Sequence, residues 1–178
     1  MRILVTGASG MIGSAVCDAL LARGDEVAGL SREPARARST NPTVAWHAWN
    51  PVHERPPEAA FEGVDAVVNL IGESIDQRLT PAAKQRIRDS RVRATKNLVD
   101  GMLAAPATPG VLVSQCALGY YGDRGEAMVD ESTPPAEDWT GRLCLDWENA
   151  ALAAADSGIR VAVLRSAPVL DPDGGLLK

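Results

Sequence analysis

Short apolar runs alternate along this chain with longer stretches in which apolar residues recur every three or four positions. The short runs have the length of buried strands, and a strand covered on both faces needs apolar side chains on both. The first predicted strand begins at Ile3, and the others span 27–30, 43–49, 65–71, 111–114 and 161–164. The pattern therefore predicts six strands separated by other elements.

The longer stretches predict helices. After the first strand, Ile12, Val16 and Leu20 recur at helical spacing, and Gly24 is placed to end that helix. Further helices are predicted over 80–103, opened by Thr80 and Pro81, and over 140–156, with loops at 51–57 and 106–110. Strands that alternate with helices indicate an α/β protein with a doubly wound parallel sheet.

A glycine motif joins the first strand to the first helix. Gly7, Gly10 and Gly13 are spaced as GxxGxxG. The first allows a sharp turn, the second leaves room for a pyrophosphate, and the third lets the helix pack close to the strand. The phosphates would meet free backbone N–H groups at the positive end of the helix. This context predicts a Rossmann-like dinucleotide-binding domain with strand order 3-2-1-4-5-6 and its ligand across the carboxyl ends of the strands.

Composition narrows the function classes. The chain has 178 residues, enough for one domain with a sizeable core, and a net charge of −5, which gives no global attraction to nucleic acid or to an anionic membrane. With a strand from Ile3 and no long apolar run, we expect neither a secretory signal nor a membrane span, and hence a cytoplasmic protein. Cys17, Cys116 and Cys144 lack metal-ligand spacing, so we expect reduced thiols and no metal site.

Several separated motifs carry a family resemblance. They are the run 6–13 (TGASGMIG), 69–72 (NLIG), 88–92 (RDSRV), 119–123 (GYYGD), 146–148 (DWE) and Arg165. In this order they resemble the extended short-chain dehydrogenase/reductase superfamily, and more closely its atypical NAD-dependent epimerase/dehydratase branch of nucleoside-diphosphate-sugar epimerase-like proteins, sometimes labelled cell-division inhibitors.

The resemblance covers the whole chain and carries further implications. It assigns 1–178 to the dinucleotide-binding domain and implies that a smaller C-terminal substrate domain is missing from this chain. With the glycine motif, it leads us to expect cofactor contacts at Gly7, Ser9, Gly10, Met11, Ile12, Leu70, Ile71, Gly72 and Val169.

The end of the second strand bears on the choice of cofactor. NAD-preferring domains carry an acidic residue there, whereas this chain has Ser31 and Arg32. Both can bind a 2′-phosphate, with Arg36 or Arg38 as helpers, so NADP(H) is favoured over NAD(H). The alternative is that Arg32 is an ordinary solvated arginine. Asn50 stands where many relatives carry an aspartate that contacts adenine.

Active members of the superfamily use a Tyr-x-x-x-Lys pair with a serine and often an asparagine. The serine position falls on Cys116, placed after strand five, and the asparagine position falls on Ser90 or Arg91. Two alignments of the Tyr-Lys pair give Arg142 with Asp146 or Leu143 with Trp147, and neither is a Tyr-Lys pair. A conventional catalytic pair is therefore not found.

Arg91, with Arg86 before it, could face the cofactor phosphates or could belong to a solvated helix face. Tyr120 and Tyr121 could supply a substitute proton donor, or could line the substrate pocket or pack under a loop. Cys116 as a nucleophile is a weaker candidate than the tyrosines, because it would need a histidine partner and both histidines, His47 and His53, lie near strand three. Trp147 is expected to anchor its helix by burial, with Glu148 solvated or capping a partner.

Two functions remain open at this point. The first is an NADP(H)-dependent oxidoreductase or epimerase-like enzyme acting on an unidentified small carbonyl or sugar-nucleotide substrate. The second is a non-catalytic NADP(H)-binding module that responds to redox state or binds a partner. Neither requires nucleic acid or a membrane, and both are compatible with an oligomer.

Overall fold

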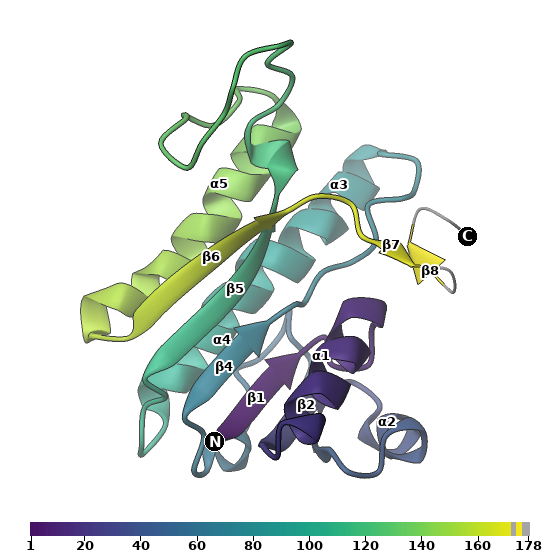
Figure 1. Ribbon diagram of the computed structural model, residues 1–178, viewed down its shortest axis with the longest axis vertical. Helices are drawn as coiled ribbons and strands as arrows, with labels where there is room; N and C mark the ends of the chain where they lie inside the picture. The colour runs from purple at the N-terminus through teal and green to yellow at the C-terminus, as the bar shows by residue number, and fades with distance from the viewer. Residues whose placement is uncertain (172–173, 176–178) are drawn as a thin grey trace.

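Six parallel strands form one sheet in the order β3-β2-β1-β4-β5-β6, which confirms the predicted 3-2-1-4-5-6 order (Figure 1). The computed structural model describes residues 1–171 and 174–175. The strands are β1 (Arg2–Thr6), β2 (Glu26–Ser31), β3 (Ala45–Ala48), β4 (Ala66–Asn69), β5 (Val111–Ala117) and β6 (Arg160–Ser166). A separate antiparallel pair is made by β7 (Leu170–Asp171) and β8 (Gly174–Gly175).

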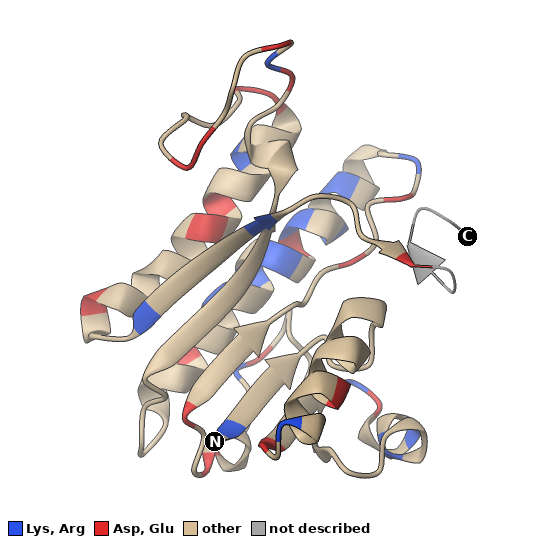
Figure 2. Cartoon of the chain, viewed as in Figure 1, with Lys and Arg blue, Asp and Glu red and all other residues tan. Residues whose placement is uncertain are grey.

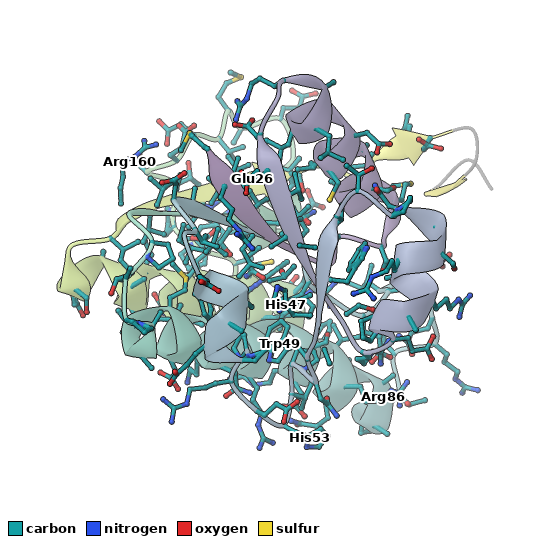
Figure 3. The ribbon with its side chains drawn as sticks, turned by 90° about the horizontal axis from the view of Figure 1, so that it is seen from below. Glu26, His47, Trp49, His53, Arg86 and Arg160 are labelled. Carbon is teal, nitrogen blue, oxygen red and sulfur yellow. The ribbon has the colours of Figure 1, made fainter. Side chains whose placement is uncertain are left out.

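Helices cover both faces of the sheet. They are α1 (Met11–Ala22), α2 (Pro34–Thr40), α3 (Pro81–Arg88), α4 (Ala94–Ala104) and α5 (Trp139–Leu152), with short 3-10 turns η1 (Glu58–Phe61), η3 (Leu118–Tyr120) and η4 (Ala153–Ser157). Seen along the sheet, α1 lies on one face and the α3–α4 helices lie on the other (Figure 3). No helix within residues 1–171 or 174–175 is long and apolar enough to cross a membrane.

The alternation of side chains along β1 explains the two layers. Ile3 and Val5 are buried in a cluster with Cys17 of α1. Leu4 points the other way and is buried in a second cluster with Leu98 and Met102 of α4. Because successive side chains of a strand point to opposite faces, one central strand supports a helix layer on each side.

The helix predicted over 80–103 is interrupted by a π-helical segment, η2 (Asp89–Arg93), between α3 and α4. Its start is as predicted, since the Thr80 hydroxyl accepts a hydrogen bond from the Ala83 N–H at 3.2 Å. Segments of π-helix occur mostly as single wide turns and often at functional sites. The wide turn here contains Ser90 and Arg91, the two alternative positions for the catalytic asparagine of the superfamily.

Strand β5 continues three residues beyond the predicted end at 114. It pairs with β6 as far as Cys116 with Arg165 and Ala117 with Ser166. Cys116 therefore lies within the strand and not after it, and α5 packs over this end of the strand.

Candidate functional site

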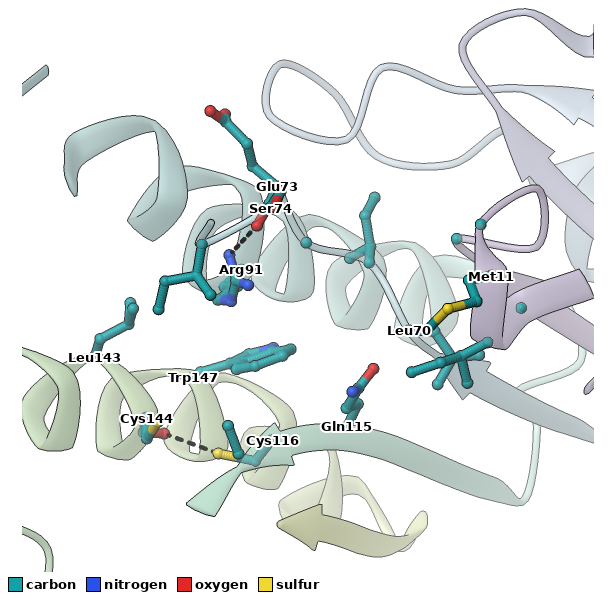
Figure 4. Close-up of a pocket in the computed structure, with 18 of the residues that line it drawn as sticks. Met11, Leu70, Glu73, Ser74, Arg91, Gln115, Cys116, Leu143, Cys144 and Trp147 are labelled. Atoms are coloured by element: carbon teal, nitrogen blue, oxygen red, sulfur yellow. Dashed lines mark hydrogen bonds between the residues drawn. The ribbon is translucent and has the colours of Figure 1, made fainter. Parts of the chain in front are cut away.

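A pocket of about 430 Å³ opens at the carboxyl ends of the central strands (Figure 4). This volume lies in the range of small-molecule and cofactor sites. At one end it is lined by the glycine turn and the segment after β4, and at the other by β5, η2 and α5. The lining residues predicted from sequence are Gly7, Gly10, Met11, Ile12, Leu70, Ile71, Gly72, Arg91 and Cys116.

The glycine end depends on the absence of side chains. Gly7 has φ of +65°, a left-handed conformation that favours glycine, and a Cβ there would lie 2.8 Å from the carbonyl oxygen of Leu70. A Cβ on Gly13 would lie only 2.1 Å from the carbonyl oxygen of Gly7. The turn is thus held against the segment after β4, with helix α1 packed close behind it.

The first turn of α1 leaves backbone donors available to a ligand. Its N-cap residue is Gly10, which makes no side-chain capping hydrogen bond, and the first turn contains no acidic residue. The first N–H groups of a helix have no partner within the helix and lie at its positive end. Because Gly10 and Met11 line the pocket, these groups form an anion-binding edge on it.

A buried polar network fixes the strand ends beneath the pocket. The Thr6 hydroxyl donates to Asn69 Oδ1 at 2.7 Å, and Asn69 Nδ2 donates to Thr95 Oγ1 at 3.0 Å and to Ser114 Oγ at 3.1 Å. Trp147 of α5 donates from Nε1 to the same Thr95 oxygen at 3.1 Å. The network joins β1, β4, α4, β5 and α5, so it sets the spacing between the two ends of the pocket.

Arg91 reaches the pocket from η2. Its Nη1 donates to the carbonyl oxygens of Glu73 at 2.9 Å and Ile87 at 3.3 Å, and its Cζ lies 5.2 Å from the centre of the Trp147 ring. Burial lowers the pKa of this guanidinium from its ordinary value. Arg91 is therefore not part of a solvated face, although its neighbours Lys84, Arg88 and Arg93 are basic and the helical run carries a band of basic residues (Figure 2).

Arg86 is placed differently from Arg91. Its Nε lies 3.1 Å from Glu73 Oε1 and its Nη2 donates to Gln77 Oε1 at 2.9 Å. Its side chain is 56% exposed and does not line the pocket. The structure therefore places Arg86 in an ion pair with Glu73 outside the pocket lining, and its contact with the cofactor phosphates stays a prediction.

The far end of the pocket is formed by Cys116 of β5 and by one face of α5. That face presents Thr140, Leu143, Cys144 and Trp147. Arg142 does not line the pocket, and Asp146 instead forms an exposed ion pair with Arg88. The alignment that places the catalytic pair at Arg142 and Asp146 therefore puts that pair outside the pocket lining.

Sequence reasoning missed Thr140 and Cys144. They are four residues apart, the spacing of the Tyr-x-x-x-Lys pair, and both face the pocket beside Cys116. The buried positions of α5 include Cys144 and Glu148. The helical spacing of the apolar residues along α5 was therefore the sequence signal that could have identified Thr140 and Cys144. Cys116 and Cys144, far apart in sequence, meet here as free thiols.

The two tyrosines pack beside the pocket and do not line it. The guanidinium carbon of Arg165 lies 3.6 Å from the centre of the Tyr120 ring, and Arg165 Nη1 donates to the Tyr121 hydroxyl at 2.9 Å. The backbone oxygens of both tyrosines accept hydrogen bonds from the loop that follows, from Ala136 and Arg124. Their side chains therefore pack against Arg165, whereas their backbone oxygens hold the loop, and a role for either as a proton donor stays a prediction.

Of the two alternatives left open for Glu148, solvated or capping a partner, the solvated one is wrong. Its two carboxylate oxygens accept hydrogen bonds from Arg165 Nε at 2.7 Å and Nη2 at 2.9 Å, and its side chain is 6% exposed. Pairing with Glu148 raises the pKa of Arg165 further above its ordinary value. The sequence placed these two residues in separate elements, and only the packing of α5 on β6 brings them together. Trp147 is buried, as predicted.

The remaining predicted contacts lie outside the pocket lining. Ser9, Arg32 and Asn50 are exposed, and Val169 is 39% exposed before β7. Ser31 ends β2 and its hydroxyl accepts a hydrogen bond from the Glu33 N–H at 3.0 Å. Their roles toward a cofactor stay predictions.

The sheet order, the glycine turn and the pocket at the carboxyl ends of the strands define a Rossmann-type dinucleotide-binding domain. The chain belongs to the NAD dependent epimerase/dehydratase family, whose model matches residues 3–173.

Curated relatives in this family include "Epimerase family protein MT2273" of Mycobacterium tuberculosis, 39% identical over 180 residues, and "Epimerase family protein SDR39U1 homolog, chloroplastic" of Arabidopsis thaliana, 36% identical over 179 residues. Each alignment covers 99% of this chain but only 56% and 51% of the relative. The chain thus spans about half the length of the curated relatives it matches.

Two solved structures resemble the chain along almost its whole length. The nucleoside-diphosphate sugar epimerase from Corynebacterium glutamicum has a TM-score of 0.82 at 32% identity, covering 99% of this chain and 36% of that one. The human epimerase family protein SDR39U1 (isoform 2), crystallised with NADPH, has a TM-score of 0.80 at 31% identity, covering 99% and 57%.

Proposed function

We propose that this chain is the NADP(H)-binding part of an oxidoreductase or epimerase-like enzyme that acts on a small carbonyl compound or a sugar nucleotide. The observation that carries the proposal is the pocket itself. One end offers backbone donors around glycines, and the other offers thiol and hydroxyl side chains and a guanidinium. Such a pocket suits a dinucleotide whose phosphates lie at the first end and whose reactive ring lies toward the second.

The residues at the glycine end fit a dinucleotide on steric grounds. Gly10 lines the pocket at the helix N-terminus, where a larger side chain would occupy the space that a pyrophosphate needs. When bound, the reduced nicotinamide would supply a hydride to the substrate carbon. The residues of this chain would hold the phosphates, exclude water and move the accompanying proton.

The absence of an acidic residue at the end of β2 supports NADP(H) over NAD(H). Arg32 is exposed and forms no ion pair with any residue of the described chain, which leaves its guanidinium free for a 2′-phosphate. The human relative crystallised with NADPH adds support from the family.

Fluorescence titration of NADPH and NADH tests the cofactor. We expect NADPH to bind at least about tenfold more tightly, since a charged bidentate contact contributes roughly 1.5 to 3 kcal/mol. Arg32→Ala should remove most of that preference. Arg160→Ala is the matched control, because Arg160 is an exposed arginine at the amino end of β6, whereas the pocket opens at the carboxyl ends of the strands. Equal affinities of the wild type for the two cofactors would overturn the NADP(H) assignment.

A second measurement separates the enzyme from the non-catalytic module. NADPH consumption by the full-length protein is followed over a panel of aldehydes, ketones and sugar nucleotides. Turnover of any of them supports an enzyme. Tight NADPH binding without turnover across the panel favours the binding module.

A further inference from the structure

Arg91 is the only cationic side chain among the described residues that line the pocket. It comes from η2 and is partly buried, with its guanidinium against Gly72 and over the ring of Trp147 (Figure 4). A Cβ on Gly72 would lie 3.1 Å from Arg91 Cζ, so a side chain there would press on the guanidinium. Within the described chain, Arg91 forms no ion pair with a carboxylate.

The hydrogen bonds of Arg91 engage only one of its three guanidinium nitrogens. Nη1 donates to the carbonyl oxygens of Glu73 at 2.9 Å and Ile87 at 3.3 Å, which ties the group to the segment after β4 and to α3. Nε and Nη2 make no hydrogen bond within residues 1–171 and 174–175, and neither is sealed from solvent. These two nitrogens form one planar edge, which matches the two oxygens of a carboxylate. That edge is open to a ligand.

A partly buried guanidinium without a charged partner is costly unless a ligand compensates it. Arginine stays protonated in proteins, although burial lowers the pKa of Arg91 because the loss of water disfavours its charged form. The carboxylates around the pocket are already bound, Glu73 by Arg86 and Glu148 by Arg165. An anion that enters the pocket would supply the partner that Arg91 lacks.

The position of Arg91 assigns this anion to the substrate and not to the cofactor phosphates. In the proposed binding mode the phosphates lie at the N-terminus of α1, beside Gly10 and Met11. Figure 4 shows Arg91 beside Trp147 and Met11 at the other end of the pocket. Arg91 therefore faces the end toward which the reactive ring and the substrate would lie.

The charges of the lining favour a carboxylate over a phosphate. The described lining residues include one cation, Arg91, and one acidic residue, Glu73. A carboxylate carries a single negative charge, whereas a phosphate monoester carries about 1.5 to 2 at neutral pH. One guanidinium balances the first, but it would leave part of the second uncompensated beside Glu73.

We propose that Arg91 binds a carboxylate of the substrate, so that the substrates are small carbonyl compounds with a carboxylate close to the carbonyl group, as in a 2-oxo acid. The proposal rests on the proposed NADP(H)-dependent reaction and narrows its substrate class. Arg91 is then a specificity-determining residue, because its open edge orients an acidic substrate and finds no partner on a neutral aldehyde or ketone.

Isothermal titration calorimetry tests the carboxylate without turnover. The full-length protein is loaded with NADP⁺, which has no hydride to deliver, and titrated with pyruvate, phenylpyruvate and the primary amides of both acids. We expect each acid to bind at least about tenfold more tightly than its amide, since charged hydrogen bonds are stronger than neutral ones. Inorganic phosphate should bind more weakly than either acid. Amides that bind as tightly as their acids, or phosphate that binds more tightly than both acids, would overturn the carboxylate assignment.

Substitutions in η2 test the role of Arg91. Arg91→Met should remove the preference for acid over amide, while NADP⁺ affinity changes less than about threefold. Arg91→Lys keeps the charge but loses the planar edge, so it should retain only part of the preference. Arg93→Met is the matched control and should match the wild type, because Arg93 is an exposed arginine of the same turn that does not line the pocket.

Three results would overturn the role of Arg91. A purely structural arginine would weaken acids and amides equally on substitution and leave the preference for the acids intact. An arginine that binds the cofactor phosphates would lower NADP⁺ affinity in Arg91→Met by about tenfold or more. A full preference for the acids in a folded Arg91→Lys protein would show that the planar edge is not used.

Turnover separates this inference from the proposed function. Neutral aldehydes and ketones that are reduced as fast as 2-oxo acids would overturn the acidic substrate class and leave the NADP(H)-dependent reaction in place. Binding of the acids that depends on Arg91, in a protein that reduces no carbonyl compound, would overturn the proposed reaction and leave the carboxylate site in place.

Discussion

The two ends of the pocket are built from different materials. The glycine end is made by the backbone, through a turn at Gly7 and a helix N-terminus at Gly10 that is left without a side-chain cap. The thiol end is made by side chains that come from β5, η2 and α5 and that depend on buried pairs behind them. The first is therefore sensitive to any added side chain, and the second to the loss of a polar partner.

Substitutions behind the thiol end are expected to cost more unfolding free energy, because a buried ion pair lies there. Arg165 and Glu148 have side chains 16% and 6% exposed, and two hydrogen bonds join them. Removing one member leaves the other charge buried without compensation, which is more costly than the pair itself is stabilising.

The largest expected effect is that of Glu148→Ala. We expect it to lower the free energy of unfolding by about 3 to 5 kcal/mol, measured by urea denaturation. Asp146→Ala is the matched control on the same helix, because it removes an ion pair with Arg88 whose side chains are about two-fifths exposed. That change should cost only about 0 to 1 kcal/mol. Similar losses of unfolding free energy in the two variants would contradict the distinction between the buried and the exposed ion pair.

At the glycine end, the next effect is on binding and not on folding. Gly10 has φ of −84°, so Gly10→Val introduces no left-handed strain, and we expect a native circular dichroism spectrum. NADPH affinity should fall by at least about 100-fold, or 2.7 kcal/mol, because the isopropyl group enters the space of the pyrophosphate.

Gly13→Val provides the contrast, since its Cβ would overlap the Gly7 carbonyl oxygen and destabilise the turn itself. Retained NADPH affinity in a folded Gly10→Val protein would remove the glycine turn from the cofactor site.

The same contrast explains what the sequence could predict. The strand order follows from the local periodicity of the apolar residues. The glycine turn follows from glycines spaced as in dinucleotide-binding turns, so Gly7 and Gly10 could be assigned to the pocket without knowledge of tertiary contacts. The seven-residue helix α2 was not predicted. Its stretch carries too few apolar residues to show an amphipathic period.

The thiol end could not be predicted in the same way. The direction of Arg91 depends on a π-helical turn that shifts the phase of the helix, and the pairing of Glu148 depends on which strand lies under α5. Aligning α5 by motif alone left two pairs open, Arg142 with Asp146 and Leu143 with Trp147, of which only the second lines the pocket. Only the buried face of the folded helix selects Thr140 and Cys144.

The last expected effect concerns the network that joins the two ends. Thr95 Oγ1 accepts hydrogen bonds from Asn69 Nδ2 and from Trp147 Nε1, and all three residues are buried. Thr95→Val keeps the shape of the side chain but leaves the indole N–H without an acceptor, whereas the Asn69 amide retains its bond to Ser114. We expect a loss of about 2 kcal/mol in unfolding free energy, together with a change in tryptophan fluorescence.

Ser114→Ala is the matched control for this network. It removes one acceptor from the same amide but leaves Thr95 in place for both of its donors. It should therefore cost about half as much as Thr95→Val, or roughly 1 kcal/mol, and should leave the fluorescence of Trp147 unchanged. A Thr95→Val protein as stable as the wild type would show that the two ends of the pocket are held together by apolar packing and not by the buried hydroxyl.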